Sequence, residues 1–195
     1  MKNQFLTYLF KARSGMAATE FAFIAPVMIS LFFGAIEART AHYTGDRVHQ
    51  AASIMADVSA KESAIAPEEL DDLMIGVENI IAPLKAKELT LNIVSVIAND
   101  NGEPIVHWSR SNKESNREPY SPGARFRELD NDDVLLPGYG LIYAEVKYNH
   151  KSGLTGRFLD KTLKIQADKI RLPRKSSRVS LCEYNESDDE YENCV

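Results

Sequence analysis

Three residues near the N-terminus have types and spacing that could support chemistry: Gly15, Met16 and Glu20. A glycine presents an open backbone that a protease can approach closely, because it has no side chain and accepts unusual dihedral angles. Cleavage after Gly15 would expose the α-amine of Met16, which is positively charged at neutral pH. Glu20 lies four residues inside that new terminus, so an amine and a carboxylate would stand near the same end of one segment.

The segment Met16 to Ile36 is long and apolar enough to cross a bilayer. As a helix, its 21 residues would span roughly 30 Å. Thr19 and Ser30 can bond back to helix carbonyls, but an ionised Glu20 in a membrane costs on the order of 2.5 to 3.5 kcal/mol. Glu20 therefore requires a partner. In a bundle of such helices the amine of one subunit would neutralise Glu20 of its neighbour and fix the axial register between them.

Charge asymmetry orients this segment. Lys2, Lys11 and Arg13 precede it with no acid among them, so the positive-inside rule keeps residues 1–15 cytoplasmic and sends the remainder across the membrane. A cleaved secretory signal is the alternative. However, the apolar run is longer than a usual signal core of about 7 to 15 residues, and residues 34–39 offer poor small-x-small cleavage sites. We expect a retained anchor.

The chain after the anchor begins with helical patterns. Small or apolar residues at helical spacing predict an amphipathic helical stalk over residues 37–65. Anchor and stalk would then form one helix of some 46 residues. The small or apolar residues of its buried face are Ala41, Val48, Ala51, Ala52, Met55 and Val58. A second helix is predicted to begin at Pro67 and to stop at Pro83. Its buried face consists of Leu70, Leu73, Met74, Val77, Ile80, Ile81 and Leu84.

Four strands are predicted from alternating apolar residues, at 89–97, 105–108, 141–148 and 163–172. Residues 99–102 have the composition of a hairpin turn, and residues 109–133 are expected to form a long loop over the sheet. Residues 154–159 fit either a short helix or a bulged crossing. A helix followed by strands predicts an α+β domain over residues 66–181, with an antiparallel sheet of about four strands packed against the second helix and the long N-terminal helix.

Two cysteines, Cys182 and Cys194, bracket an acidic tail over residues 182–195. In a domain that crosses to an oxidising compartment, an even cysteine count favours a disulfide over two free thiols. Two cysteines also lack the ligand count of a structural zinc site.

Composition and motifs argue against several functions. A net charge of −5 argues against a nucleic-acid partner, and there is no Gly-x-Ser-x-Gly or Walker-type sequence. Asp130–Asp133 lacks the glycine and glutamate of a calcium loop, and Asp188–Glu190 is interpreted as a solvated acidic stretch, since a calcium site there would also need a ring of backbone oxygens. The histidines are His42, His49, His107 and His150. The first two lie seven residues apart on one predicted helical face, and two ligands are too few for a zinc site. We expect no catalytic residue, metal or cofactor; a secreted hydrolase would need a grouped nucleophile and base or paired carboxylates.

The sequence resembles TadE-like minor pseudopilins of the tight-adherence (Tad) pilus. Gly15 followed by Glu20-Phe21 and an apolar helix looks like the processing site of type IVb prepilins. Further blocks fall in the order typical of the family. They are Met55-Ala56-Asp57, His107-Trp108-Ser109-Arg110, Leu136-Pro137-Gly138, Ala144-Glu145-Val146-Lys147-Tyr148 and Pro173-Arg174.

The resemblance implies a processing site at Gly15, Met16, Glu20 and Phe21, cut after Gly15 by a membrane aspartyl prepilin peptidase. It implies bacterial inner-membrane residence, with a cytoplasmic N-terminus and a periplasmic domain, and a non-enzymatic role in pilus biogenesis and adherence. The implied partners are the peptidase, other pilins and pseudopilins of the system, and the inner-membrane assembly platform. The alternative is an unprocessed bitopic inner-membrane protein whose periplasmic domain binds a ligand or partner.

Overall fold

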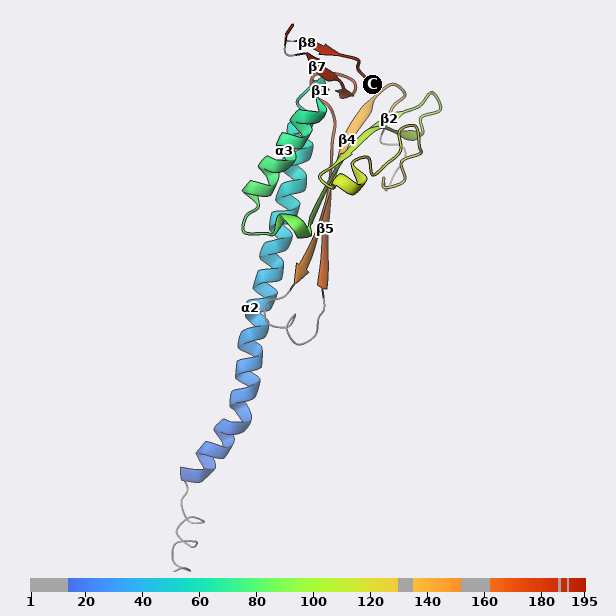
Figure 1. Ribbon diagram of the computed structural model, residues 1–195. Coiled ribbons are helices and arrows are strands. Elements are labelled where there is room, and N and C mark those ends of the chain that lie inside the picture. The colour runs from blue at the N-terminus through green and yellow to red at the C-terminus, as the bar shows by residue number, and fades with distance from the viewer. Residues whose placement is uncertain (1–13, 130–134, 152–161, 186, 189) are drawn as a thin grey trace, which may run out of the picture.

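One long helix belongs to both the predicted anchor and the domain. In the computed structural model, helix α2 (Ser14–Ser59) has 46 residues and continues through Gly45 without interruption. Figure 1 shows its N-terminal part projecting away from the domain, while its C-terminal part lies along the sheet. The prediction that anchor and stalk form one continuous helix is therefore confirmed.

The structure describes residues 14–129, 135–151, 162–185, 187–188 and 190–195. Three sequence predictions fall outside these ranges. They concern the leader before Ser14, the acidic stretch Asp130–Asp133 and the segment 154–159.

The C-terminal half of α2 packs on the sheet through small and apolar side chains. The fully buried residues are Val48, Ala51, Ala52, Met55 and Ala56, which repeat at three- and four-residue spacing as predicted. Alanines allow the helix to approach the sheet closely. Val58 was predicted on this face but is 38% exposed, because the buried stripe ends in Ser59 and Ala60.

Helix α3 (Pro67–Ile80) begins at the predicted proline. The backbone N–H of Ala66 donates to Glu69 Oε2 at 2.7 Å, which satisfies a donor just before the first turn. Leu70, Met74, Val77 and Ile81 are buried. Ile80 was predicted in this face but is 49% exposed, since Val77 and Ile81 take the inward positions at the end of the helix.

A four-stranded antiparallel sheet has the order β3-β2-β4-β5. The strands are β2 (Leu89–Ala98), β3 (Pro104–Ser111), β4 (Gly140–Lys151) and β5 (Thr162–Arg171). The predicted second strand was too short, because Ser109 and Ser111 pair with Val94 and Asn92 and extend the ladder. The predicted α+β class, with a second helix and about four antiparallel strands, is confirmed.

Both faces of the sheet are covered. Residues facing α2 and α3 include Leu91, Ile93, Ile142, Ala144 and Val146. Residues on the other face include Val94, Val96, Leu141 and Tyr143, which pack under Phe126 and Leu129 from the segment after β3. The Phe126 and Tyr143 rings lie 5.0 Å apart in an edge-to-face arrangement. The predicted loop over the sheet is therefore observed for its described residues. Leu163 at the start of β5 is 52% exposed, outside both faces.

The C-terminal residues fold back beside the start of α3. The short strands here are β1 (Ala64–Ile65) parallel to β6 (Ser180–Leu181), and β7 (Glu183–Asn185) antiparallel to β8 (Glu190–Glu192). Cys182 and Cys194 are joined in the expected disulfide. The Tyr191 hydroxyl lies 3.0 Å from both carboxylate oxygens of Glu69, so the acidic segment is attached to α3. These strands were not expected from the sequence.

Replacing both cysteines by serine should lower the stability of the domain. Closing this loop contributes roughly 3 kcal/mol in the chain-entropy model. The measurement is a denaturant titration of the detergent-solubilised chain, followed by the fluorescence of the buried Trp108. Reduction of the wild-type disulfide should shift the midpoint as far as the double substitution does, and equal midpoints for oxidised wild type and variant would contradict the prediction.

Candidate functional site

The predicted processing residues all lie at the start of α2. Gly15 and Met16 lie in the part of α2 next to its described start at Ser14, and Glu20 and Phe21 follow in the next turn. The exposed fractions of Met16 and Phe21 are 64% and 71%, and Glu20 is also exposed. Met16, Glu20 and Phe21 are therefore not covered by the described part of the domain.

The hydroxyls of the anchor are satisfied within the helix, but its carboxylate is not. Thr19 Oγ1 donates to the Met16 carbonyl and Ser30 Oγ donates to the Pro26 carbonyl, each at 2.8 Å. Both bonds follow the sequence prediction. Within the part of the chain that the structure describes, the Glu20 carboxylate has no hydrogen-bond or ion-pair partner. This carboxylate is therefore left to water, to the membrane interface or to a group outside the described residues.

Within the described ranges, α2 is the one helix long and apolar enough to cross a membrane. Its most apolar window has a mean hydropathy of 2.0 and none of it is buried in the domain. A long core helix of a soluble protein would instead be covered by its neighbours. An exposed apolar stretch of this length fits a membrane anchor.

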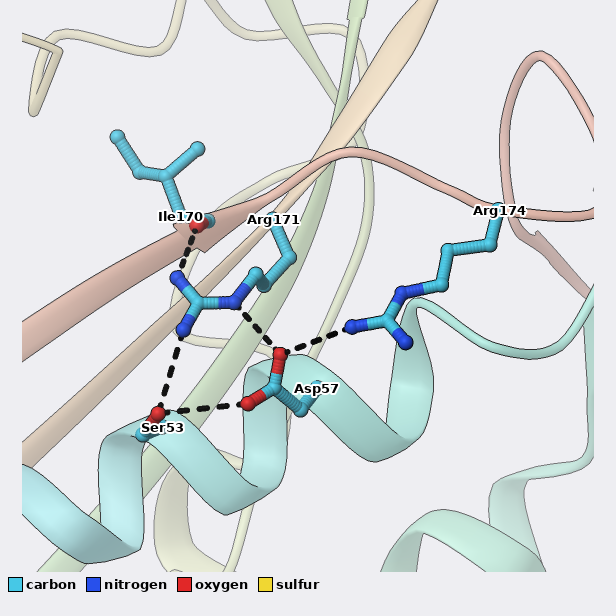
Figure 2. Close-up of polar contacts among 5 residues, drawn as sticks. All are labelled: Ser53, Asp57, Ile170, Arg171 and Arg174. Carbon is cyan, nitrogen blue, oxygen red and sulfur yellow. Dashed lines mark hydrogen bonds and ion pairs between the residues drawn. The ribbon is translucent and has the colours of Figure 1, made fainter.

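Asp57 ties the C-terminal end of α2 to the end of β5 (Figure 2). Arg171 Nε donates to Asp57 Oδ1 at 2.6 Å, and Arg174 Nη2 donates to the same oxygen at 3.4 Å. Ser53 Oγ donates to the other oxygen of Asp57 at 3.4 Å. The hydrogen bond from Arg171 lowers the pKa of the Asp57 carboxyl below its usual value. The sequence blocks 55–57 and 173–174 therefore meet in one ion-pair network.

A second ion-pair network connects α3 to the outer strand β3. Arg110 donates to both oxygens of Asp71, from Nε at 3.0 Å and from Nη2 at 2.8 Å. Arg117 Nη1 adds a third bond at 3.0 Å. Because both oxygens are held by Arg110, this is the bidentate geometry in which an arginine binds most strongly. The hydrogen bond from Arg110 lowers the pKa of the Asp71 carboxyl.

Trp108 holds the chain that follows β5. Its Nε1 donates to the Val179 carbonyl at 2.8 Å, and Ser95 Oγ donates to the same carbonyl at 3.2 Å. Trp108 and Val179 are both buried in the core on the helix-covered face. Next to Trp108, burial lowers the pKa of the half-buried His107 imidazole. The block 107–110 therefore serves packing and chain connection in this structure.

The other polar candidates are not brought together. His42 and His49 are exposed on α2, His107 lies on β3, and His150 is buried on β4. Among residues with a described position, no three His, Cys, Asp or Glu side chains group in a way that could hold a metal ion.

One buried carboxylate was part of a sequence block but was not predicted to have a role of its own. Glu145 on β4 is 2% exposed. It accepts hydrogen bonds from Lys147 Nζ at 2.7 Å, Asn92 Nδ2 at 2.9 Å and Gln166 Nε2 at 2.8 Å. These donors come from β4, β2 and β5, so Glu145 links three strands. The sequence signal was an acid and a base two residues apart in an otherwise apolar strand, but its donors on β2 and β5 depend on strand register.

Stability should fall as the pH is lowered below about 4. A carboxyl group with a lowered pKa stabilises the fold above its unfolded value, which is 3.8 for Asp57 and Asp71, and this stabilisation disappears as the pH falls through the lowered folded value. Asp57→Asn and Asp71→Asn should each reduce stability at neutral pH. Each should also make stability fall less steeply at acidic pH, in what we call the acid limb of the pH profile. Denaturant midpoints measured between neutral and acidic pH check both effects.

Asp72→Asn is the matched control for this measurement. Asp72 lies next to Asp71 on α3, is exposed, and makes no ion pair within the described residues. Its substitution should leave the acid limb unchanged. An acid limb that is equally steep in wild type, Asp57→Asn and Asp71→Asn would contradict the assignment of these two carboxylates.

Comparison with known proteins concerns the same N-terminal segment. Residues 15–57 match the family model described as TadE-like protein. The matched segment begins at Gly15, includes Glu20 and Phe21, and ends at Asp57, the residue that joins α2 to β5. Searches of the curated proteins and of the solved structures found no match. The resemblance indicated by the sequence is therefore confirmed over residues 15–57, where this chain is similar to TadE-like proteins.

Proposed function

We propose that this chain is a minor pseudopilin that a prepilin peptidase cleaves after Gly15 and that acts in the assembly of a Tad-type adhesive pilus. The observation that carries the proposal is the TadE-like match over residues 15–57, which starts at the proposed cleavage residue. In this role the chain is a structural subunit without catalytic activity. It resides in the inner membrane, with residues 1–15 cytoplasmic and the domain periplasmic.

The bare surface of the anchor supports an assembly role. From Met16 to Ile36 the large apolar side chains are exposed, with fractions from 42% for Phe33 and Ile36 to 81% for Phe23. In a bilayer these side chains contact lipid, and in a filament they would contact the equivalent helices of neighbouring subunits. The partners we propose are the prepilin peptidase, other pilins and pseudopilins, and the inner-membrane assembly platform.

Glu20 is the proposed assembly contact. After cleavage, the α-amine of Met16 would stand four residues before it, at the same end of an apolar helix. A lone helix gives this carboxylate no described partner, whereas a staggered neighbour would place a cationic amine beside it. Removing one partner of such a buried pair costs on the order of 3 to 5 kcal/mol. The pair would therefore select one axial offset between subunits.

Cleavage can be tested on the full chain in cells that contain the matching peptidase. The intact mass should fall by residues 1–15, and N-terminal sequencing should begin at Met16. Gly15→Leu should block processing, because the side chain obstructs close approach to the backbone. Gly34→Leu is the control, since a side chain at Gly34 would meet nothing within 4 Å and should leave cleavage intact. Unchanged full-length protein in these cells would instead favour an unprocessed bitopic membrane protein.

Glu20→Ala should affect assembly more than cleavage. The substituted chain should still lose residues 1–15, but its entry into sheared pili should fall by 100-fold or so, as expected for loss of about 3 kcal/mol. Glu20→Asp should restore part of the incorporation, because it keeps the charge. Immunoblots of sheared pili and of membranes give both quantities, and normal incorporation of Glu20→Ala would overturn the proposed contact.

A further inference from the structure

The end of the sheet nearest the anchor lies close to where the bilayer must end. We call this the anchor-proximal end; it consists of η1 (Ala86–Glu88), the end of β4 and the start of β5. Thr44 Oγ1 on α2 lies 3.4 Å from His150 Nδ1 on β4, which sets the height of this end along the helix. Figure 1 shows the end of β4 and the start of β5 on the side of the domain toward the projecting part of α2.

Helix geometry converts this contact into a distance from the membrane. From Ile36 to Thr44 the helix rises about 12 Å. The headgroup layer outside the hydrocarbon core is roughly 5 to 7 Å thick, so the level of the Thr44–His150 contact lies within about one Debye length, near 8 Å, of the headgroups. Charges at this level therefore interact with the membrane surface, and salt weakens this interaction.

Exposed lysines gather at the anchor-proximal end. Lys85 and Lys87 are exposed on or beside η1, Lys151 ends β4, and Lys164 lies near the start of β5. Lys151 Nζ lies 3.2 Å from Glu88 Oε1, and this contact links η1 to the end of β4. Lys113 Nζ donates to the Lys87 carbonyl at 3.4 Å and brings a further cation to the same place. The acids described at this level include Asp46, Glu78 and Glu88, the last of which is paired with Lys151. The lysines outnumber them, so the described surface of this end has an excess of positive charge.

Partly exposed apolar side chains accompany the lysines. Tyr43 on α2 is 45% exposed and stacks against the Arg47 guanidinium, 5.0 Å from its ring centre. Arg47 in turn donates to the Ile80 carbonyl at 2.9 Å, which places the end of α3 at the same level. Leu163 is 52% exposed at the start of β5. Aromatic residues beside basic ones are typical of the water boundary of a bilayer.

We propose that the anchor-proximal end binds the phosphodiester headgroups of anionic lipids in the bilayer that holds the anchor. The inference rests on the membrane anchoring in the proposed function and adds a second, electrostatic contact with the same membrane. Lys87, Lys151 and Lys164 bind the lipid phosphates. The domain is held down on the membrane before assembly, and leaving the membrane requires the release of these contacts.

The test measures the height of the domain above the bilayer. Trp108, the single tryptophan of the chain, is 2% exposed in the domain core and serves as the donor for energy transfer to dansyl-labelled headgroups. The full chain is reconstituted in vesicles of phosphatidylcholine alone or of an equimolar mixture with phosphatidylglycerol. We expect higher transfer efficiency in the anionic vesicles, and molar salt should lower it to the value in phosphatidylcholine.

Two charge-matched variants separate local from overall charge. Lys87→Gln, Lys151→Gln and Lys164→Gln combined should abolish the rise in transfer in anionic vesicles. The control combines Lys61→Gln, Lys175→Gln and Arg178→Gln, which removes three positive charges from the opposite end and should keep the rise. Trp108 fluorescence in detergent verifies that both variants fold.

Flotation of the same vesicles distinguishes this inference from the proposed function. A chain that floats with both kinds of vesicle but shows equal transfer efficiency in them would overturn lipid binding by the anchor-proximal end. The membrane anchor would still stand. The lysines would then be free for an acidic protein partner. A rise in transfer efficiency that persists in the combined Lys87, Lys151 and Lys164 variant would also overturn lipid binding. A chain that does not float would overturn the membrane anchor and this inference together.

Discussion

The rest of the structure depends on the packing of the C-terminal half of α2 against the sheet. Val48, Ala51, Ala52, Met55 and Ala56 are fully buried there, while the N-terminal half of the same helix is bare. A single continuous helix therefore carries both an internal surface and an external one. Its 46 residues extend about 70 Å at 1.5 Å per residue, so one element reaches from the anchor to the far end of the domain.

Polar contacts secure this arrangement at its edges. Asp57 joins the end of α2 to Arg171 at the end of β5, and Asp71 joins α3 to Arg110 on β3. Each carboxylate is partly exposed, so each ion pair contributes less than a buried pair would. These ion pairs contribute mainly to the arrangement of the elements, because they connect the two helices to opposite edge strands of one sheet. The match to TadE-like proteins ends at Asp57, the point where this connection begins.

The anchor presents the opposite situation, since its side chains lack partners within the domain. Lipid satisfies the apolar ones without a specific geometry, but it cannot satisfy the Glu20 carboxylate. A helix with one such group is tolerated in a monomer near the interface and favoured in a complex that supplies a cation. In the proposed function, this difference in energy between the two environments favours transfer of the subunit from the lipid into a filament.

The sequence alone determined the elements whose signal is local. The apolar length of residues 16–36, the continuous helical pattern through Gly45, the proline at the start of α3 and the alternation in β2 and β4 all depend on neighbours within one or two turns or strands. The proposed processing residues, Glu20 among them, were predicted from the same kind of signal, because the chemistry proposed for them depends on spacing along one helix. The α+β class followed from the order of these elements.

Tertiary structure decided what depends on long-range register. The meeting of Asp57 with Arg171 spans more than one hundred residues, and two donors to Glu145, Asn92 and Gln166, lie on neighbouring strands, so no local pattern indicates these contacts. The exposure of Val58 and Ile80 depends on where the buried stripe ends, which helical periodicity does not state. The strands after Leu181 were missed because their acidic residues resemble a solvated tail; the disulfide and the Tyr191 contact with Glu69 order them. The sequence determines which side chains are present and how they are spaced, but their partners across the sheet are set only when the strands pair.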